Sequence, residues 1–417
     1  MSGLYNPDTE HSSCGVGFLT RKDGVQTHEV VRKLHEALCA VPHRGGMSSE
    51  GVGDGAGVNL DLSLRFFSEL TSRPDLRLGQ FGVGNFFLPT DPAFHDEAEA
   101  VIEAALETHG LEILLKRDVP VDNSAIRPAA VKYQLPIRQW VFLTTSDRDI
   151  HDALMAIEAI AYTRAELLGL YPLSLSARTQ VLKGRLNSGE VVPYFTDLSD
   201  PRMEVHSMFF HTRFSTNTVP NAMMAQPFRL MAHNGELNTD KKNRLSDNAI
   251  ARARNRSIVR PLGQSDSCRL DQTLQNRVYE DELDVVSAVV AMMPPAWEND
   301  STLSPQVRAM LEFFSLYEEK NDGPAALIFG NGTIIGARLD RLGLRPLRTV
   351  ETAEYLGVMS EAGQVYFPPK KCSPAGGSRP AACCTTTTAR AAPTAPLKRW
   401  KCLPRAMITP PCWPRRG

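Results

Sequence analysis

The chain has 417 residues, of which 42% are hydrophobic and 22% are charged, and its formal net charge is −1. These values are typical of a globular protein in water, and the length allows more than one domain. The charge is unevenly distributed, because residues 370–417 hold ten Lys or Arg and no acid, which leaves the preceding body acidic. An acidic body gives no electrostatic reason to expect nucleic acid or an anionic membrane as a partner.

The first thirteen residues, MSGLYNPDTEHSS, are polar and include two acids, so they do not resemble a secretory signal. The sequence holds no run of about 18 apolar residues, and we therefore expect no membrane span. Residues 1–369 contain three widely separated cysteines, Cys14, Cys39 and Cys268. This spacing predicts neither a disulfide framework nor a metal site, and it favours a reducing, cytoplasmic location.

The first half of the chain alternates strand and helix patterns. Apolar spacing predicts a strand over 14–19 and a helix over about 30–41 that ends at Pro42. A glycine-rich loop then leads to a strand over 58–62. Further along, a strand over 140–143 precedes an apolar-striped helix over about 150–168.

In the second half, two predicted strands, 208–210 and 228–232, each run into a polar segment. Helical patterns dominate from about 245 to 318. Strands over 325–329 and 333–337 then flank Asn331-Gly332, which is a strong hairpin signal. Strands near both ends, with helices between them, predict a layered α+β domain.

The segment 370–417 has a different composition from the rest of the chain. It holds five of the eight cysteines and eight of the 29 prolines, without a hydrophobic period. The cysteine spacing fits no ordinary zinc pattern. A basic tail that binds metal or nucleic acid is one interpretation, but we favour an unstructured or out-of-frame extension and assign it no function.

Cys14 is the first candidate for chemistry. It begins the segment CGVGF (14–18), whose glycines permit close backbone approach. On its own, such a cysteine is more typical of a small buried core residue. If the polar leader 1–13 is a removable propeptide, however, Cys14 gains a free α-amine with a pKa of about 7.7–8.0, which can accept the thiol proton.

Two polar segments supply candidate partners. The segment HTRFSTNT (211–218) places Arg213 among hydroxyl and amide side chains, and its guanidinium is suited to the α-carboxylate of an amino acid. An ion-paired or solvated arginine is the alternative. In HNGELNT (233–239), the side-chain NH₂ of Asn234 and the backbone N–H of Gly235 suit an oxyanion. A plain Asn-Gly turn is the alternative there.

The short segment SDS (265–267) is open to two interpretations. Asp266 offers a carboxylate for a substrate ammonium group. Ser and Asp are also favoured at helix N-termini, so the same residues fit the start of a helix near Ser267.

Taken together, the motifs resemble those of a known family. CGVGF, HRG, GDGAG, HTRFSTNT, HNGELNT, SDS and the late DRLGLRP (340–346) occur in the order seen in class II glutamine amidotransferases. The residues of these motifs are most similar to those of the N-terminal glutaminase domain of the glutamate synthase large subunit. The resemblance covers roughly residues 10–369. It implies a four-layer αββα N-terminal-nucleophile hydrolase fold and autocatalytic removal of residues 1–13.

The resemblance also implies roles for individual residues. Cys14 would attack the side-chain amide of L-glutamine and form a γ-glutamyl thioester, with Asn234 and Gly235 as the oxyanion donors. The remaining matched positions are implied to bind the substrate: Arg213, Thr216 and Asn217 its carboxylate, Asp266 its amino group, and Arg44 the surroundings of the nucleophile, where a purely structural role is equally open.

The family sends its ammonia to a synthase domain that makes glutamate from 2-oxoglutarate with FMN, an iron–sulfur cluster and a reductant. The resemblance ends near Pro369, so we expect this chain to carry the 14–369 glutaminase domain and neither cofactor. A reductase subunit or ferredoxin is implied only for the intact system. Two alternatives stay open: another class II amidotransferase with a different ammonia acceptor, and a catalytically silent interaction module.

Overall fold

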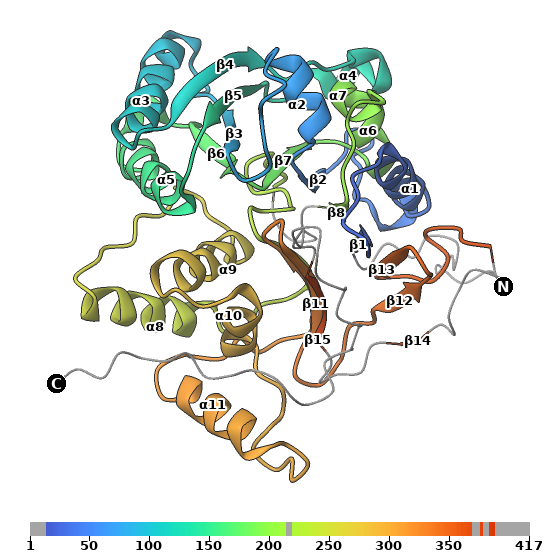
Figure 1. The fold of residues 1–417 in the computed structure, drawn as a ribbon, viewed down its shortest axis with the longest axis vertical. Coiled ribbons are helices and arrows are strands. Elements are labelled where there is room, and N and C mark those ends of the chain that lie inside the picture. The colour runs from blue at the N-terminus through green and yellow to red at the C-terminus, as the bar shows by residue number, and fades with distance from the viewer. Residues whose placement is uncertain (1–13, 214–218, 369–375, 378–382, 388–417) are drawn as a thin grey trace.

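The computed structural model describes residues 14–213, 219–368, 376–377 and 383–387, and its strands form three antiparallel sheets (Figure 1). The largest sheet has the order β14–β12–β13–β1–β8–β2–β7. Its strands are β1 (Gly15–Arg21), β2 (Ala56–Asp61), β7 (Thr179–Gly184), β8 (Ser207–Thr212), β12 (Arg348–Glu351), β13 (Tyr355–Met359) and β14 (Gly376–Gly377). The second sheet has the order β15–β11–β10–β9, with β9 (Met231–Gly235), β10 (Ala325–Gly330), β11 (Ile334–Leu339) and β15 (Cys383–Thr387).

The first two sheets pack face to face. Val16 and Phe18 of β1 are fully buried and belong to one apolar cluster with Ala326 and Ile328 of β10. The outer face of the first sheet carries α1 (His28–Cys39), and that of the second carries α9 (Asp266–Gln275) and α10 (Val285–Met292). This stacking of helix, sheet, sheet and helix confirms the predicted α+β, four-layer αββα fold.

The central position of β1 explains its composition. With a layer on each side, successive residues of the strand are buried, which requires an apolar run rather than alternation. Helix α1 instead buries one stripe, formed by Val30, Val31, Leu34, Ala37 and Leu38. Both elements were predicted from these patterns, and α1 ends at Cys39, shortly before Pro42.

A third sheet, in the order β4–β5–β3–β6, was largely missed. Only β5 was predicted. One face of this sheet extends the main core, and the other packs against two helices. These elements are β3 (Phe81–Phe87), α3 (His95–Thr108), β4 (Glu112–Asp118), β5 (Ile137–Leu143), α5 (Asp147–Ala161) and β6 (Tyr171–Ser176). Helix α5 ends seven residues before the predicted end at Leu168, and a separate 3-10 turn, Ala165–Leu167, follows it.

Two of the predicted late elements are confirmed and one is shifted. The hairpin of β10 and β11 turns at Gly332, whose φ of 85° favours glycine. Strand β9 begins at Met231 rather than at 228, because the Phe228 N–H donates to the Met231 carbonyl and closes a turn. The expected helical region contains α8 (Asp240–Ala253), α9, α10 and α11 (Pro305–Ser315).

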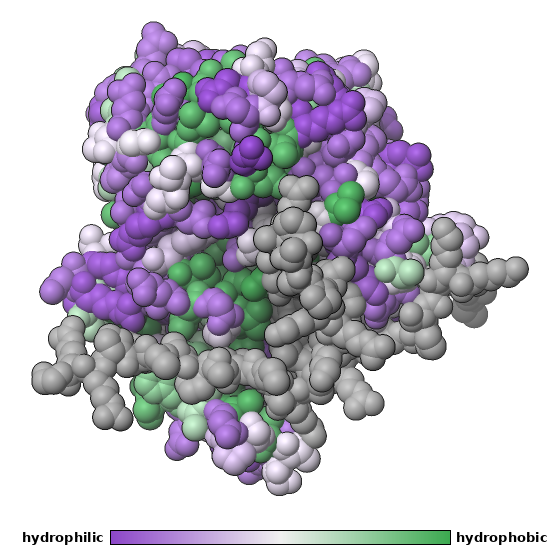
Figure 2. Space-filling view, in the orientation of Figure 1, coloured by the Kyte–Doolittle hydropathy of each residue, from purple (hydrophilic) through white to green (hydrophobic). Residues whose placement is uncertain are grey.

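The remaining helices are short: α2 (Leu64–Leu70), α4 (Pro128–Val131), α6 (Val191–Tyr194) and α7 (Thr196–Ser199). Figure 2 shows a largely hydrophilic surface over the upper part of the molecule and hydrophobic surface nearer α11, where Phe313 and Leu316 are exposed. Within the described ranges, we find no helix with the length and apolarity needed to cross a bilayer. The strands β14 and β15 fall in the segment 370–417 that the sequence analysis treated as a tail.

Candidate active site

Cys14 lies at the start of β1, against the end of β8. The Gly15 N–H donates to Thr212 Oγ1 at 3.0 Å, and a Cβ on Gly15 would lie 2.7 Å from the same oxygen. Glycine at this position therefore lets the two strands approach closely. Because Arg213 directly follows Thr212, the register places it beside the cysteine.

Asn234, on the second sheet, reaches across to the cysteine. Its side-chain nitrogen Nδ2 donates to the Cys14 carbonyl at 2.9 Å, and the residue is 4% exposed. An asparagine NH₂ carries two hydrogens, so the second remains available for another acceptor. The contact joins residues that are 220 positions apart in the sequence.

Gly235, the next residue of β9, has a backbone N–H that does not take part in the pairing with β10. The Glu236 N–H bonds the Pro324 carbonyl at 3.0 Å, and neighbouring residues of an antiparallel strand point their N–H groups in opposite directions. The N–H of Gly235 is therefore directed away from β10, toward the open edge of β9. A Cβ on Gly235 would lie 1.9 Å from the Pro324 oxygen, so only glycine fits without movement.

Arg213 has an unusual backbone conformation, with a φ of 81°, and its N–H donates to the Gly55 carbonyl at 2.8 Å. Its Nε and Nη1 atoms are buried and have no hydrogen-bond partner among the described residues. A buried guanidinium with unused donors is suited to a carboxylate ligand. The predicted carboxylate-binding residues Thr216 and Asn217 lie outside the described residues.

Burial raises the pKa of the Cys14 thiol to about 11, although the positive charges of Arg213 and Arg345 act in the opposite direction. The thiol is therefore protonated at neutral pH in this form of the chain. Neither arginine can accept its proton, since a guanidinium stays charged in proteins. Activation of the sulfur consequently needs another base.

Arg345, in the DRLGLRP motif, lies near Cys14, although no role was predicted for it from the sequence. Asp340, in the same motif, holds the loop by accepting hydrogen bonds from the backbone N–H groups of Leu342, Leu344 and Arg345. The loop leaves the Arg345 charge close enough to act on both Cys14 and His233. The motif could have suggested Arg345, because this arginine follows Asp340, whose carboxylate can accept several backbone hydrogen bonds and so hold a turn.

Asp266 is the first residue of α9. The helix is capped by Ser265, whose side chain accepts from the Cys268 N–H, so SDS does start a helix while leaving the Asp266 carboxylate for other contacts. The carboxylate acts electrostatically on His233, which directly precedes Asn234. Burial nevertheless lowers the pKa of His233 to about 4, so its imidazole is neutral near pH 7.

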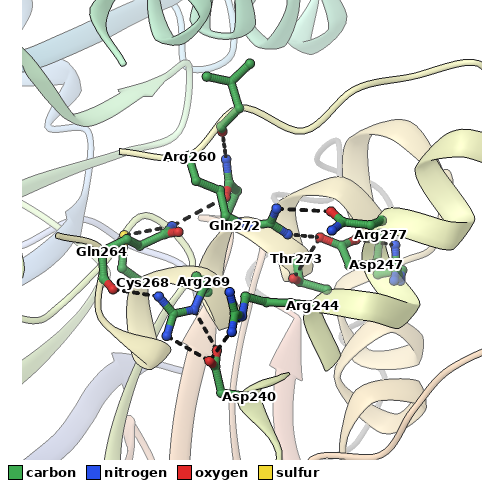
Figure 3. Close-up of polar contacts among 12 residues, drawn as sticks. Asp240, Arg244, Asp247, Arg260, Gln264, Cys268, Arg269, Gln272, Thr273 and Arg277 are labelled. Atoms are coloured by element: carbon green, nitrogen blue, oxygen red, sulfur yellow. Dashed lines mark hydrogen bonds and ion pairs between the residues drawn. The ribbon is translucent and has the colours of Figure 1, made fainter. Parts of the chain in front are cut away.

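Polar contacts hold α9 to the segment that follows β9 (Figure 3). Asp240, at the start of α8, accepts a bidentate pair of hydrogen bonds from Arg269 at 2.6 and 2.9 Å. It also forms an ion pair with Arg244 at 3.2 Å. Arg269 also donates to the Gln264 carbonyl at 2.6 Å. A planar guanidinium fixes orientation as well as distance, which stabilises the arrangement of α8 relative to α9.

Arg44 lies beside Gly15, the residue after Cys14, but its guanidinium contacts another group. Its Cβ would lie 3.5 Å from a Cβ on Gly15, and its Nε contacts Glu361. Glu361 also contacts His43 at 3.0 Å and follows Ser360, which bonds Val16 through its backbone and side chain. This geometry supports the structural alternative for Arg44, while a substrate contact stays a prediction.

A family model described as glutamine amidotransferases class-II matches residues 14–388. Ferredoxin-dependent glutamate synthase 1 of Arabidopsis thaliana is 34% identical over 392 residues, covering 88% of this chain and 24% of that protein. Glutamate synthase (NADH) of Saccharomyces cerevisiae is 32% identical over 379 residues, covering 84% of this chain and 18% of that protein.

Glutamate synthase (NADPH) large chain of Bacillus subtilis is 33% identical over 387 residues, covering 87% of this chain and 25% of that protein. The chain thus spans between 18 and 25% of the length of these relatives. Among solved structures, a glutamine phosphoribosylpyrophosphate amidotransferase from B. subtilis is 14% identical with a TM-score of 0.24, over 72% of this chain and 49% of that chain. The family match extends past residue 369, so the domain boundary at that position stays a prediction.

Proposed function

Because the chain belongs to the class II glutamine amidotransferases, we propose that it hydrolyses L-glutamine to glutamate and ammonia with Cys14 as the nucleophile. The observation that carries this proposal is the contact of the Asn234 side chain with Cys14, next to a glycine whose N–H is not used in the sheet. The side chain of Asn234 contacts the cysteine directly, and the adjacent Gly235 N–H is directed to the open edge of the same strand. Preorganised donors of this kind stabilise the oxyanion of a tetrahedral intermediate.

Proton transfer at Cys14 motivates the second part of the proposal, which is cleavage between Ser13 and Cys14. The released α-amine, with a pKa of about 7.7–8.0, accepts the proton that the buried thiol holds. The sulfur then attacks the side-chain amide carbon of glutamine, and a C–S bond forms. The C–N bond breaks as the ammonium of Cys14 returns the proton to the amide nitrogen, which leaves as ammonia. Water then cleaves the thioester, which gives glutamate and restores the thiol.

Substrate binding uses the charged groups around this centre. Arg213 binds the α-carboxylate through the buried donors that lack a partner among the described residues, with Thr216 and Asn217 contributing from the adjacent segment. Asp266 binds the α-ammonium group. A free amino acid carries both charges, so the arrangement favours L-glutamine over an internal glutamine of a peptide.

The small share of each relative that this chain covers limits what can be proposed for the use of the ammonia. Since the chain spans at most a quarter of each, we assign to a longer protein the use of ammonia to convert 2-oxoglutarate to glutamate. FMN, an iron–sulfur cluster and the partner that supplies electrons, either a reductase subunit or ferredoxin, belong to that longer protein. No step proposed above uses them. We propose a cytoplasmic location.

A glutaminase assay with three proteins tests the proposal: the wild type, Cys14→Ala, and Cys39→Ala as a matched control on the exposed end of α1. We expect ammonia release by the wild type and the control, and loss of release in Cys14→Ala. Equal low rates in all three would support the silent interaction module instead.

A further inference from the structure

A series of hydrogen bonds links β9, the strand that carries Asn234 and Gly235, to the carboxylate of Asp266. His233 Nε2 lies 2.5 Å from Ser267 Oγ, and Ser267 Oγ lies 3.1 Å from Asp266 Oδ1. The Ser267 N–H also donates to the same carboxylate oxygen at 2.7 Å. His233 and Ser267 are buried, whereas Asp266 is only half-buried. One end of the series is therefore fixed, and its other end reaches toward solvent.

The hydrogen atoms in this series of hydrogen bonds can be assigned from the number of donors that each group has. An ionised carboxylate only accepts, so the single hydroxyl hydrogen of Ser267 points to Asp266. The Ser267 oxygen must then accept from His233, which places the imidazole hydrogen on Nε2. The other nitrogen, Nδ1, is buried without a partner in the described part of the chain, as expected for a bare acceptor of a neutral ring. The reverse tautomer would bury an unpaired N–H, which costs more.

The backbone of His233 is held as firmly as its side chain. Its N–H donates to Gln226 Oε1 at 2.7 Å, and its carbonyl accepts from His211 Nε2 at 3.0 Å. These bonds fix the edge of β9 at the residue before Asn234. The same residue thus anchors β9 through its backbone and the Asp266 carboxylate through its side chain.

We propose that Ser267 and His233 are positioning residues for the α-ammonium group of the substrate, acting through Asp266. The two bonds to Oδ1 set the rotation of the carboxylate and leave Oδ2, which has no described hydrogen-bond partner, to receive the ammonium. This inference rests on the proposed function, because it takes Asp266 as the ammonium ligand. The specific consequence is that Ser267 matters only for ligands that carry an amino group.

Binding of two product-like ligands tests the inference without requiring catalysis. L-glutamate and glutarate share both carboxylates and differ by the amino group alone. Their dissociation constants are measured by calorimetry on the full chain, as wild type, Ser267→Ala and Ser267→Thr. The control is Ser287→Ala on α10, where a buried serine hydroxyl contacts Asp284 in the same way but away from the site.

We expect Ser267→Ala to weaken L-glutamate binding by about 10- to 100-fold, as the loss of one hydrogen bond to a charged group does, and to leave glutarate binding unchanged. Ser267→Thr, which keeps the hydroxyl, and Ser287→Ala should bind both ligands as the wild type does. His233→Leu should show the same selective loss for L-glutamate. Equal weakening of both ligands would reduce Ser267 to a general structural role and overturn the proposal.

Two further outcomes are separable. If the wild type binds L-glutamate no better than glutarate, the ammonium site itself is wrong and the inference falls with it. If binding behaves as expected but the chain releases no ammonia from glutamine, only the proposed function is overturned.

Discussion

Replacing Asn234 with alanine removes one of the two proposed oxyanion donors and gives the most quantitative test of the site. The side chain makes one described hydrogen bond, to the Cys14 carbonyl, which contributes about 0.5–1.5 kcal/mol to stability. Its effect on the reaction should be larger, because a missing oxyanion donor raises the barrier by about 2.7–4 kcal/mol. We therefore expect kcat to fall about 100- to 1000-fold while KM changes little, since the oxyanion exists only after attack.

The assay is steady-state ammonia release, with thermal unfolding measured in parallel. Asn85→Ala is the matched control, because Asn85 is a fully buried asparagine on β3 whose Nδ2 donates to the Val181 carbonyl at 3.0 Å, away from Cys14. We expect this control to lose stability but keep its kcat. A kcat for Asn234→Ala within about tenfold of the wild type, or a rise in KM alone, would refute the oxyanion assignment.

Three further predictions concern neighbouring groups. Gly235→Ala forces a Cβ against the Pro324 carbonyl, so we expect both lower kcat and lower stability, measured by the same two assays. Burial lowers the pKa values of His211 and His233 to about 3 and 4, so the unfolded chain binds more protons than the folded chain below pH 6.5. The free energy of unfolding should therefore fall on acidification by up to about 2.7 kcal/mol per pH unit, which urea titrations at several pH values can measure. Burial lowers the pKa of Lys183 to about 7, so wild-type stability should rise between pH 7 and 9 relative to Lys183→Met; parallel curves for the two proteins would contradict this.

The sequence predicted the elements whose patterns are local. The apolar run of β1, the stripe of α1 and the turn at Gly332 each reflect neighbours a few residues apart, so periodicity was sufficient. The third sheet was mostly missed because its strands bury polar groups: Asn85 and Gln139 are almost fully enclosed and hydrogen-bond each other. Such residues interrupt the apolar pattern by which strands are recognised.

The prediction of the candidate site rests on the order of its motifs rather than on any local rule. The contact of Asn234 with Cys14 depends on the packing of two sheets, which no spacing in the sequence reveals. For the same reason, the His233–Ser267 link emerged only from the fold. Arg44 illustrates the converse, because its motif was recognised but its contact with Glu361 supports a structural role.

The identity of the reacting group is tested most directly by trapping the thioester. The purified chain is mixed with L-glutamine, quenched in acid within one turnover, digested and analysed by mass spectrometry. We predict a peptide whose first residue is Cys14 and whose sulfur carries a γ-glutamyl group. An active preparation whose adduct lies on another residue, or whose Cys14 is still joined to Ser13, would contradict the account.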